Sequence, residues 1–248
     1  MKLDFAGLTD VGNVRAVNQD DFYIDPQGRF FIVADGMGGH AGGQEASQIA
    51  AQTIKDYLQD HWNDPDASTL LKEAMLSAND AIVCDQKAHP ERSDMGTTAV
   101  VVVFREESHV WCANVGDSRI YQLRGENLTQ VTEDQTWVAQ AVKREVLTAD
   151  EARVHPWRHV LSQCLGREDL SFVEIESIQV EAGDRLLLCS DGLTEELADD
   201  LILGQLKLTQ SCEQIASILI TEAKQREGRD NITVIVISVE PTSGPSSS

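Results

Sequence analysis

Residues 30–43 have the sequence FFIVADGMGGHAGG. The first five residues are apolar, which is typical of a buried β-strand, and the run ends in the carboxylate of Asp35. Five glycines follow within eight residues, and a helical pattern begins near Glu45. Glycine lets the main chain approach a ligand closely, so this stretch is typical of a site for a small, highly charged ligand. It leaves open whether that ligand is a metal, a phosphate or neither.

The composition limits the classes of protein that this chain can belong to. Its 248 residues are 42% hydrophobic and 25% charged, which is ordinary for a globular protein with a sizeable core. The net charge of -21 would repel nucleic acid and anionic membranes, so we expect neither as a partner. The start lacks the apolar core of a signal peptide, and no apolar run approaches the roughly 20 residues of a membrane helix. The five cysteines form no Cys-x-x-Cys pair. We expect a cytoplasmic monomer.

Hydrophobic periodicity predicts an alternation of strands and helices. Strands are expected at residues 3–9, 21–24, 30–34, 97–104, 110–115, 118–123, 173–180, 185–189 and 231–239. Amphipathic helices are expected from about residue 45 to 58, from a cap at Ser68 to residue 82, and over 198–208 and 212–223. The short connections between strands favour antiparallel sheets. We therefore predict an α+β fold, an α-β-β-α sandwich of two antiparallel sheets flanked by helix pairs.

One domain accounts for most of the chain. We expect a catalytic domain over residues 1–240 and a disordered polar tail over 241–248. The segment of about 130–172 is polar and helical without a β-rich run, so we predict that it is an insertion, a flap.

Carboxylates recur at the ends of the predicted strands. Asp35, Asp117, Asp191 and Asp230 each lie at an end of an apolar β run, and Asp20 lies in the first polar loop. A single such residue is usually a turn cap. Four of them would repel one another if the strand ends met, unless cations lay among them. All-oxygen sites suit Mg²⁺ or Mn²⁺, and two such ions can activate water for attack on a phosphoryl group.

Arg15 adds a positive charge in the same loop as Asp20. A guanidinium matches the geometry of a phosphate with paired hydrogen bonds. In isolation, a solvated surface arginine is the more ordinary interpretation.

Six short motifs carry these residues, in order, between about Leu3 and Val239. They are Arg15-x-x-Asn18-Gln19-Asp20, Val33-Ala34-Asp35-Gly36-Met37-Gly38-Gly39, Gly96-Thr97-Thr98, Val115-Gly116-Asp117-Ser118-Arg119, Cys189-Ser190-Asp191-Gly192 and Gly228-Arg229-Asp230-Asn231. The series resembles the motifs of bacterial protein phosphatase 2C, the metal-dependent PPM serine/threonine phosphatases. The stretch from His155 to Glu168 is also similar to that of cyanobacterial members, which act on the phosphoserine form of the PII nitrogen-signalling protein.

The resemblance implies hydrolysis of phosphoserine or phosphothreonine by attack of a water that bridges two divalent ions, Mg²⁺ or Mn²⁺. Asp35 would bridge the two core ions, the Gly36 carbonyl would bind one of them, and Asp191 and Asp230 would complete the ligands. Asp117 would hold a third, weaker ion together with Asp191.

The resemblance also implies roles outside the ligand set. Asp20 would orient metal-bound water, and Arg15 would bind the substrate phosphate. The partners would be phosphorylated proteins, phosphorylated PII among them.

Two positions depart from the family pattern. Some members carry a histidine two residues after the bridging aspartate, proposed as the acid that protonates the leaving group, and here that residue is Met37. His40 lies three residues further on and is a candidate acid, with a metal-bound water as the alternative. Many members have glutamate where this chain has Gln19, which removes one carboxylate but no ligand.

Other features receive ordinary interpretations. His155 and His159 have the i, i+4 spacing of a zinc site on a helix, but Pro156 lies between them and no third ligand is apparent, so packing or substrate contact is favoured. For Thr97 and Thr98, β-propensity is a sufficient explanation.

Two other functions are compatible with the motifs. An inactive homologue that binds phosphoproteins would be expected to lack a core ligand, and none is missing. A metal-dependent phosphodiesterase would need the same ions, but the acidic charge argues against a nucleic-acid substrate.

Overall fold

The computed structural model describes residues 1–39, 42–105, 108–170 and 172–241, and it forms two antiparallel sheets. The five-stranded sheet has the order β1-β11-β10-β7-β8. Its strands are β1 (Lys2–Asp10), β11 (Ile232–Glu240), β10 (Arg185–Cys189), β7 (Arg119–Arg124) and β8 (Asn127–Gln130). The second sheet has the order β2-β3-β5-β6-β9, and β4 pairs with β3 beside it. Its strands are β2 (Asp20–Ile24), β3 (Phe30–Met37), β4 (Gly96–Thr97), β5 (Ala99–Phe104), β6 (His109–Val115) and β9 (Glu174–Gln179).

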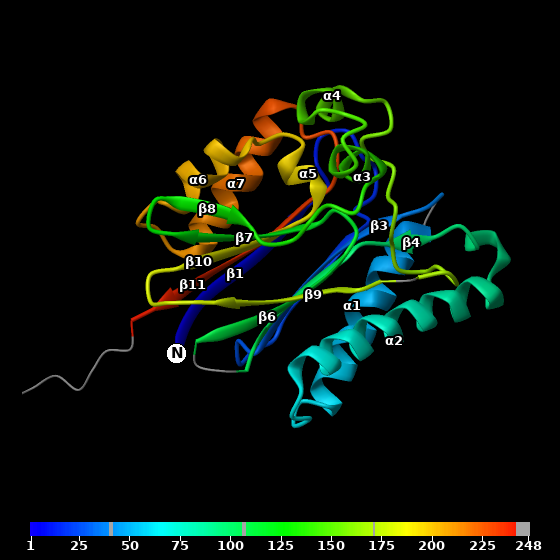
Figure 1. The fold of residues 1–248 in the computed structure, drawn as a ribbon, viewed down its shortest axis with the longest axis horizontal. Coiled ribbons are helices and arrows are strands. Elements are labelled where there is room, and N and C mark those ends of the chain that lie inside the picture. Colours follow the sequence, from blue (N-terminus) through cyan, green and yellow to red (C-terminus); the bar gives the residue numbers. More distant parts are fainter. Residues whose placement is uncertain (40–41, 106–107, 171, 242–248) are drawn as a thin grey trace, which may run out of the picture.

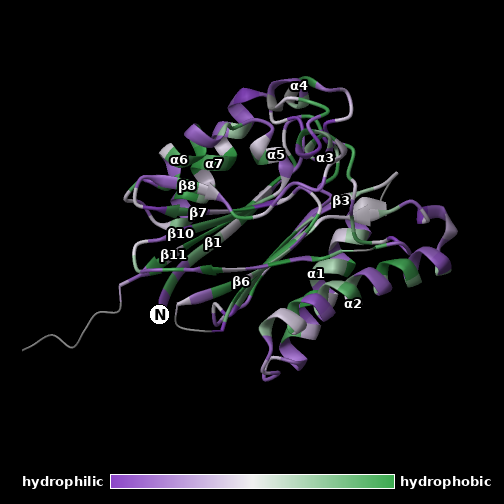
Figure 2. Ribbon diagram, viewed as in Figure 1, coloured by the Kyte–Doolittle hydropathy of each residue, from purple (hydrophilic) through white to green (hydrophobic). Residues whose placement is uncertain are grey.

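Helices cover the outer faces of both sheets, which confirms the predicted sandwich (Figure 1). Helices α1 (Gly42–Asp60) and α2 (Ala67–Ala88) pack on the second sheet, and the short η1 (Pro90–Arg92) follows them. Helices α6 (Asp199–Leu206) and α7 (Cys212–Arg226) cover the five-stranded sheet, beside the single turn of α5 (Asp191–Thr194). A third apolar cluster fills the space between the sheets, and Figure 2 shows the hydrophobic strands enclosed between helices with polar outer faces. No helix in the described ranges is long and apolar enough to cross a membrane.

Strand periodicity carries Asp35 to the mouth of the sandwich. Phe31 and Val33 belong to the core between the sheets, whereas Phe30 and Ile32 pack against the helices. Because side chains alternate along a strand, Asp35 follows Phe31 and Val33 on the inner face. Asp20 is its cross-strand partner on β2. The two carboxylates therefore lie between the sheets, at the end of their strands.

Several boundaries differ from the prediction for local reasons. β3 continues through Asp35 to Met37, because the Gly36 amide donates to the Gln19 carbonyl and Gly36 pairs with Thr97. The run predicted as one strand over 97–104 is divided into β4 and β5 at Thr98. The N-cap of α2 is Asp66 rather than Ser68, since the Asp66 side chain accepts from the Ser68 amide. β8 was not predicted.

The region predicted as a flap lies between β8 and β9. It contains the short helices α3 (Trp137–Lys143) and α4 (Ala149–Val154), which lie at the top of Figure 1 near α5. Its return to the core is held by backbone bonds between Leu165 and Thr97 and by the Asn79 side chain, whose Oδ1 accepts from the amides of Gly166 and Arg167. Of the predicted tail, residues 242–248 lie outside the described residues.

The contact between α5 and Asn231, the residue before β11, leaves no room for a side chain at Gly192. A Cβ there would lie 2.0 Å from the Asn231 carbonyl oxygen, a backbone atom that cannot move aside cheaply. We expect Gly192→Ala to lower the free energy of unfolding by about 1–3 kcal/mol or more, measured by urea denaturation. Gly204→Ala in α6 is the matched control, because a Cβ there meets nothing within 4 Å and alanine is the better helix former. Equal stability of the two variants would contradict this packing.

Candidate metal and phosphate site

Five aspartates predicted from the motifs meet at one end of the sandwich. Asp20 and Asp35 face each other across β2 and β3, and Asp191 begins α5 directly after β10. Asp117 lies in the turn between β6 and β7, and Asp230 precedes β11. The carboxyl groups of Asp35 and Asp191 are within hydrogen-bonding contact, and the other carboxylates all act electrostatically on Asp35. The fold thus brings together every carboxylate of the predicted set.

Burial and mutual repulsion disfavour the charged forms of these groups. Burial raises the pKa of Asp35 well above its ordinary value, and the carboxylates of Asp20, Asp191, Asp117 and Asp230 raise it further. The pKa of Asp117 is raised by burial and by Asp191. For Asp20 the pKa rises from 3.8 to about 7, and for Asp191 to about 6, with burial as the largest cause in both.

These shifts have a consequence for stability. A carboxyl group whose pKa is higher in the folded than in the unfolded chain binds more protons in the folded state. Without cations, the Asp20 carboxyl therefore destabilises the fold progressively as the pH rises from 3.8 to about 7. Cations among the carboxylates would remove this penalty.

Asp20 offers a direct test of whether a hydrated ion fits. Its Oδ2 accepts from the hydroxyls of Ser190 and Thr233, at 2.8 and 2.7 Å. Its Oδ1 is buried and has no hydrogen-bond partner among the described residues. A buried acceptor of this kind requires a donor, and water held by a cation would supply one. The all-oxygen set of carboxylates suits Mg²⁺ or Mn²⁺.

Thr97 and Thr98 fix the backbone of Asp35, so β-propensity does not explain them fully. The Thr97 hydroxyl donates to the Asp35 carbonyl at 2.8 Å, and the Asp35 amide donates to Thr98 Oγ1 at 3.1 Å. Thr98 Oγ1 also lies 2.7 Å from the Ser118 hydroxyl, next to Asp117. The two threonines therefore connect the turn that carries Asp117 to the strand that carries Asp35.

Gly36 is required by close packing of the main chain. A Cβ there would lie 1.9 Å from the Gly43 carbonyl oxygen at the start of α1, and 2.6 Å from the Gln19 carbonyl oxygen. Any side chain would push the helix away from the end of β3.

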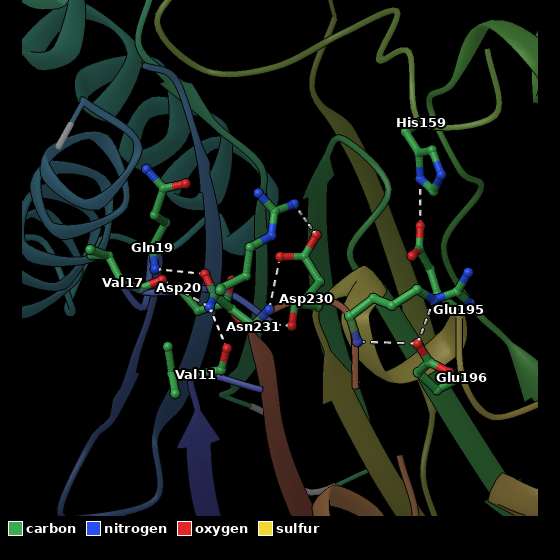
Figure 3. Close-up of polar contacts among 12 residues, drawn as sticks. Val11, Val17, Gln19, Asp20, His159, Glu195, Glu196, Asp230 and Asn231 are labelled. Atoms are coloured by element: carbon green, nitrogen blue, oxygen red, sulfur yellow. Dashed lines mark hydrogen bonds and ion pairs between the residues drawn. The ribbon is translucent and has the colours of Figure 1, made fainter. Parts of the chain in front are cut away.

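Arg15 lies at the rim of the carboxylate cluster. Its Nη2 donates to Asp230 Oδ2 at 2.6 Å, and its side chain is about half exposed. Asn231 fastens the loop that carries Arg15. Its Nδ2 donates to the carbonyls of Val11 and Val17, and its Oδ1 accepts from the Gln19 amide (Figure 3). This anchoring role of Asn231 was not predicted, although the residue stands in the last motif.

His159 reaches the cluster from the flap, a position that the sequence did not predict. Its Nδ1 lies 2.5 Å from Glu195 Oε1, and Figure 3 shows the ring directed at that carboxylate. Candidate ligand atoms of His159, Asp191 and Glu195 all lie within 4.8 Å of one another. His155 is not part of this group, since it stacks on Trp137 in the flap.

Glu195 was missed by the sequence analysis. It lies four residues after Asp191, where a helix that begins at Asp191 would place both on one face. Burial raises the pKa of Glu195 to about 7, with Asp191 and Asp230 as further causes. It therefore belongs electrostatically to the same cluster.

The candidate acid His40 lies outside the described residues, so the structure places no histidine from the glycine-rich stretch. Met37 ends β3.

Comparisons with known proteins identify relatives of this chain. A family model described as protein phosphatase 2C matches residues 13–227. The serine/threonine protein phosphatase PstP of Mycobacterium tuberculosis is 36% identical over 237 residues, which are 96% of this chain and 45% of PstP. The chain thus spans about half the length of that relative. The serine/threonine phosphatase stp of Listeria monocytogenes is 34% identical over 244 residues, 94% of this chain and 95% of that protein.

Solved structures show the same fold. The catalytic domain of PstP in complex with two manganese ions matches with a TM-score of 0.87 at 34% identity, over 96% of this chain and 99% of that one. Because the family model covers most of the chain and the relatives exceed 30% identity over nearly all of it, this chain belongs to the protein phosphatase 2C family.

Proposed function

We propose that this protein hydrolyses phosphoserine and phosphothreonine in proteins, with divalent cations held by the carboxylate cluster. The observation that supports the proposal is the convergence of five aspartates whose mutual repulsion divalent cations would relieve, with Arg15 at their rim. When bound, Mg²⁺ or Mn²⁺ would supply an activated water and neutralise charge on the phosphoryl group. The match to the manganese-bound PstP domain supports this choice of ions.

Each residue of the chain has a separate task in this proposal. Asp35, the Gly36 carbonyl, Asp191 and Asp230 would hold the two core ions. Asp20 is anchored by two hydroxyls, and its Oδ1, which has no partner among the described residues, would accept a hydrogen bond from the attacking water and orient it. Once Asp230 binds a cation, Arg15 would be released from it to hold the phosphate.

A third, weaker ion would lie between Asp117 and Asp191. Glu195 and His159 lie close enough to Asp191 to be further candidate ligands. The acid that protonates the leaving group remains either His40 or a water on one of the ions.

The proposed substrates are phosphorylated proteins in the cytoplasm, with the protein acting as a monomer. Phosphorylated PII stands among them because of the resemblance in the flap. Turnover of several purified phosphoproteins, phosphorylated PII included, should rank it first. Equal turnover of all of them would remove the PII assignment and leave the phosphatase activity intact.

Removal of one ligand should abolish the reaction. We expect p-nitrophenyl phosphate hydrolysis in Mn²⁺ to fall at least about 100-fold in Asp191→Asn, and to be lost in EDTA, because the ions lose a ligand or are removed. Asp200→Asn is the matched control, since Asp200 is an exposed acid in α6. Activity that survives both chelation and Asp191→Asn would reject the proposal. Faster turnover of a phosphodiester than of the monoester would favour a phosphodiesterase, and stoichiometric phosphoprotein binding without turnover would indicate an inactive regulator.

Loss of the guanidinium should weaken substrate recognition. We expect Arg15→Ala to lower kcat/KM for a phosphopeptide by about 10- to 100-fold, because a hydrogen bond to a charged phosphate is lost. Arg15→Lys should recover part of the loss, since it keeps the charge but not the paired geometry. Steady-state kinetics in saturating Mn²⁺ provide the measurement. Wild-type kcat/KM in Arg15→Ala would exclude phosphate binding by this residue.

A further inference from the structure

Gln135 joins the start of the flap to the turn that carries Asp117. Its backbone amide donates to the Gly116 carbonyl at 2.9 Å, and its side-chain Oε1 accepts from the Gly116 amide at 3.0 Å. Its Nε2 lies 3.4 Å from the Asn114 carbonyl on β6. Both polar groups of the Gly116 backbone are therefore held by one residue, immediately before Asp117.

The same residue holds the far side of the flap. The Gln135 carbonyl accepts from the Ser162 amide at 2.7 Å and from the Ser162 hydroxyl at 2.9 Å. Ser162 follows His159 by three residues, and His159 contacts Glu195 beside Asp191. Gln135 is thus bonded to both sides of the candidate metal site. It bonds Gly116, next to Asp117, and it bonds Ser162, three residues after His159.

The turn at Gly116 has little freedom of its own. Gly116 has φ of +111°, a conformation that favours glycine, and a Cβ there would lie 2.6 Å from the Thr98 side chain. Thr98 is in turn bonded to Ser118 and to the backbone of Asp35. On the core side the turn is therefore fixed by Thr98, and on the flap side by Gln135.

We propose that Gln135 is a positioning residue that couples the flap to the Asp117 side of the metal site. Ion binding by Asp117 and Asp191 and the arrangement of the flap seen in this structure then stabilise each other through the Gly116 and Ser162 bonds. By linkage, the factor by which ion binding stabilises this arrangement of the flap equals the factor by which the arrangement strengthens ion binding. This inference rests on the proposed metal-dependent function and adds an uncharged residue that acts through hydrogen bonds to Gly116 and Ser162.

The test measures ion binding and flap accessibility rather than turnover alone. Gln135→Leu removes the acceptor for the Gly116 amide at similar volume, while its backbone bonds remain. We expect it to weaken the weakest Mn²⁺ affinity seen by calorimetry by about 5- to 20-fold, and the two tighter sites by far less. The Mn²⁺ concentration that protects Lys143 and Arg144, exposed in the flap, from trypsin should rise by the same factor.

Matched variants separate coupling from general damage. Gln140→Leu changes an exposed glutamine of α3 whose bonds are made by its backbone, and it should leave both measurements unchanged. In Asp117→Asn the weak site is already lost, so adding Gln135→Leu should cause no further change in protection. Ser162→Ala deletes one bond on the flap side only, and it should shift both measurements in the same direction by about 3-fold. If Gln135→Leu does not fold, the result for Ser162→Ala decides whether the coupling exists.

Two outcomes would overturn the inference. One is wild-type weak-site affinity in Gln135→Leu, and the other is a change in trypsin protection without any change in Mn²⁺ affinity. Absence of phosphatase activity in the wild-type protein is a different result, since it rejects the proposed function while the binding and protection measurements still decide the coupling.

Discussion

Repulsion among buried carboxylates is the constraint on which the rest of this structure depends. Asp35 lies where burial and four other aspartates all oppose its ionisation. A fold that gathers such groups loses stability in the absence of cations as the pH approaches neutrality, because each group must either keep its proton or remain charged beside its neighbours. Burial and the neighbouring Asp230 carboxylate raise the pKa of Asp191 by more than Arg15 and Arg119 lower it. Cations among the carboxylates would relieve the remaining repulsion.

The backbone and the carboxylates of the cluster are held in place by several hydrogen bonds from neutral side chains. Asp35 is held by hydroxyls from two threonines, Asp20 by Ser190 and Thr233, and the Arg15 loop by Asn231. Glycines at 36 and 192 let main chain pack at distances that no side chain permits. These neutral contacts hold the carboxylates near one another against their mutual repulsion, so that little reorganisation is required when ions bind.

The flap contributes a different type of side chain to the carboxylate cluster. The core strands contribute carboxylates, whereas the flap contributes an imidazole through His159, directed at Glu195. Its two ends are hydrogen-bonded close to the carboxylate cluster, to Gly116 through Gln135 and to Thr97 through Leu165. Movement of the flap cannot be independent of the geometry at Asp117 and Asp35, because the same hydrogen bonds define both.

The sequence by itself determined the sandwich, its strands and the identity of the aspartates, because apolar runs with period two and acids at their ends are local patterns. The order of the six motifs indicated the protein phosphatase 2C family, and the family in turn implied divalent cations. Only the tertiary structure decided that Glu195 and His159 stand beside Asp191, since a flap residue and a core helix meet through contacts that no local pattern encodes. The roles of Thr97, Thr98, Asn231 and Gln135 were hidden for the same reason. Their side chains bond backbone atoms that are far away in the chain. The sequence does not show which partner an amide or a hydroxyl will have, because the tertiary fold decides it.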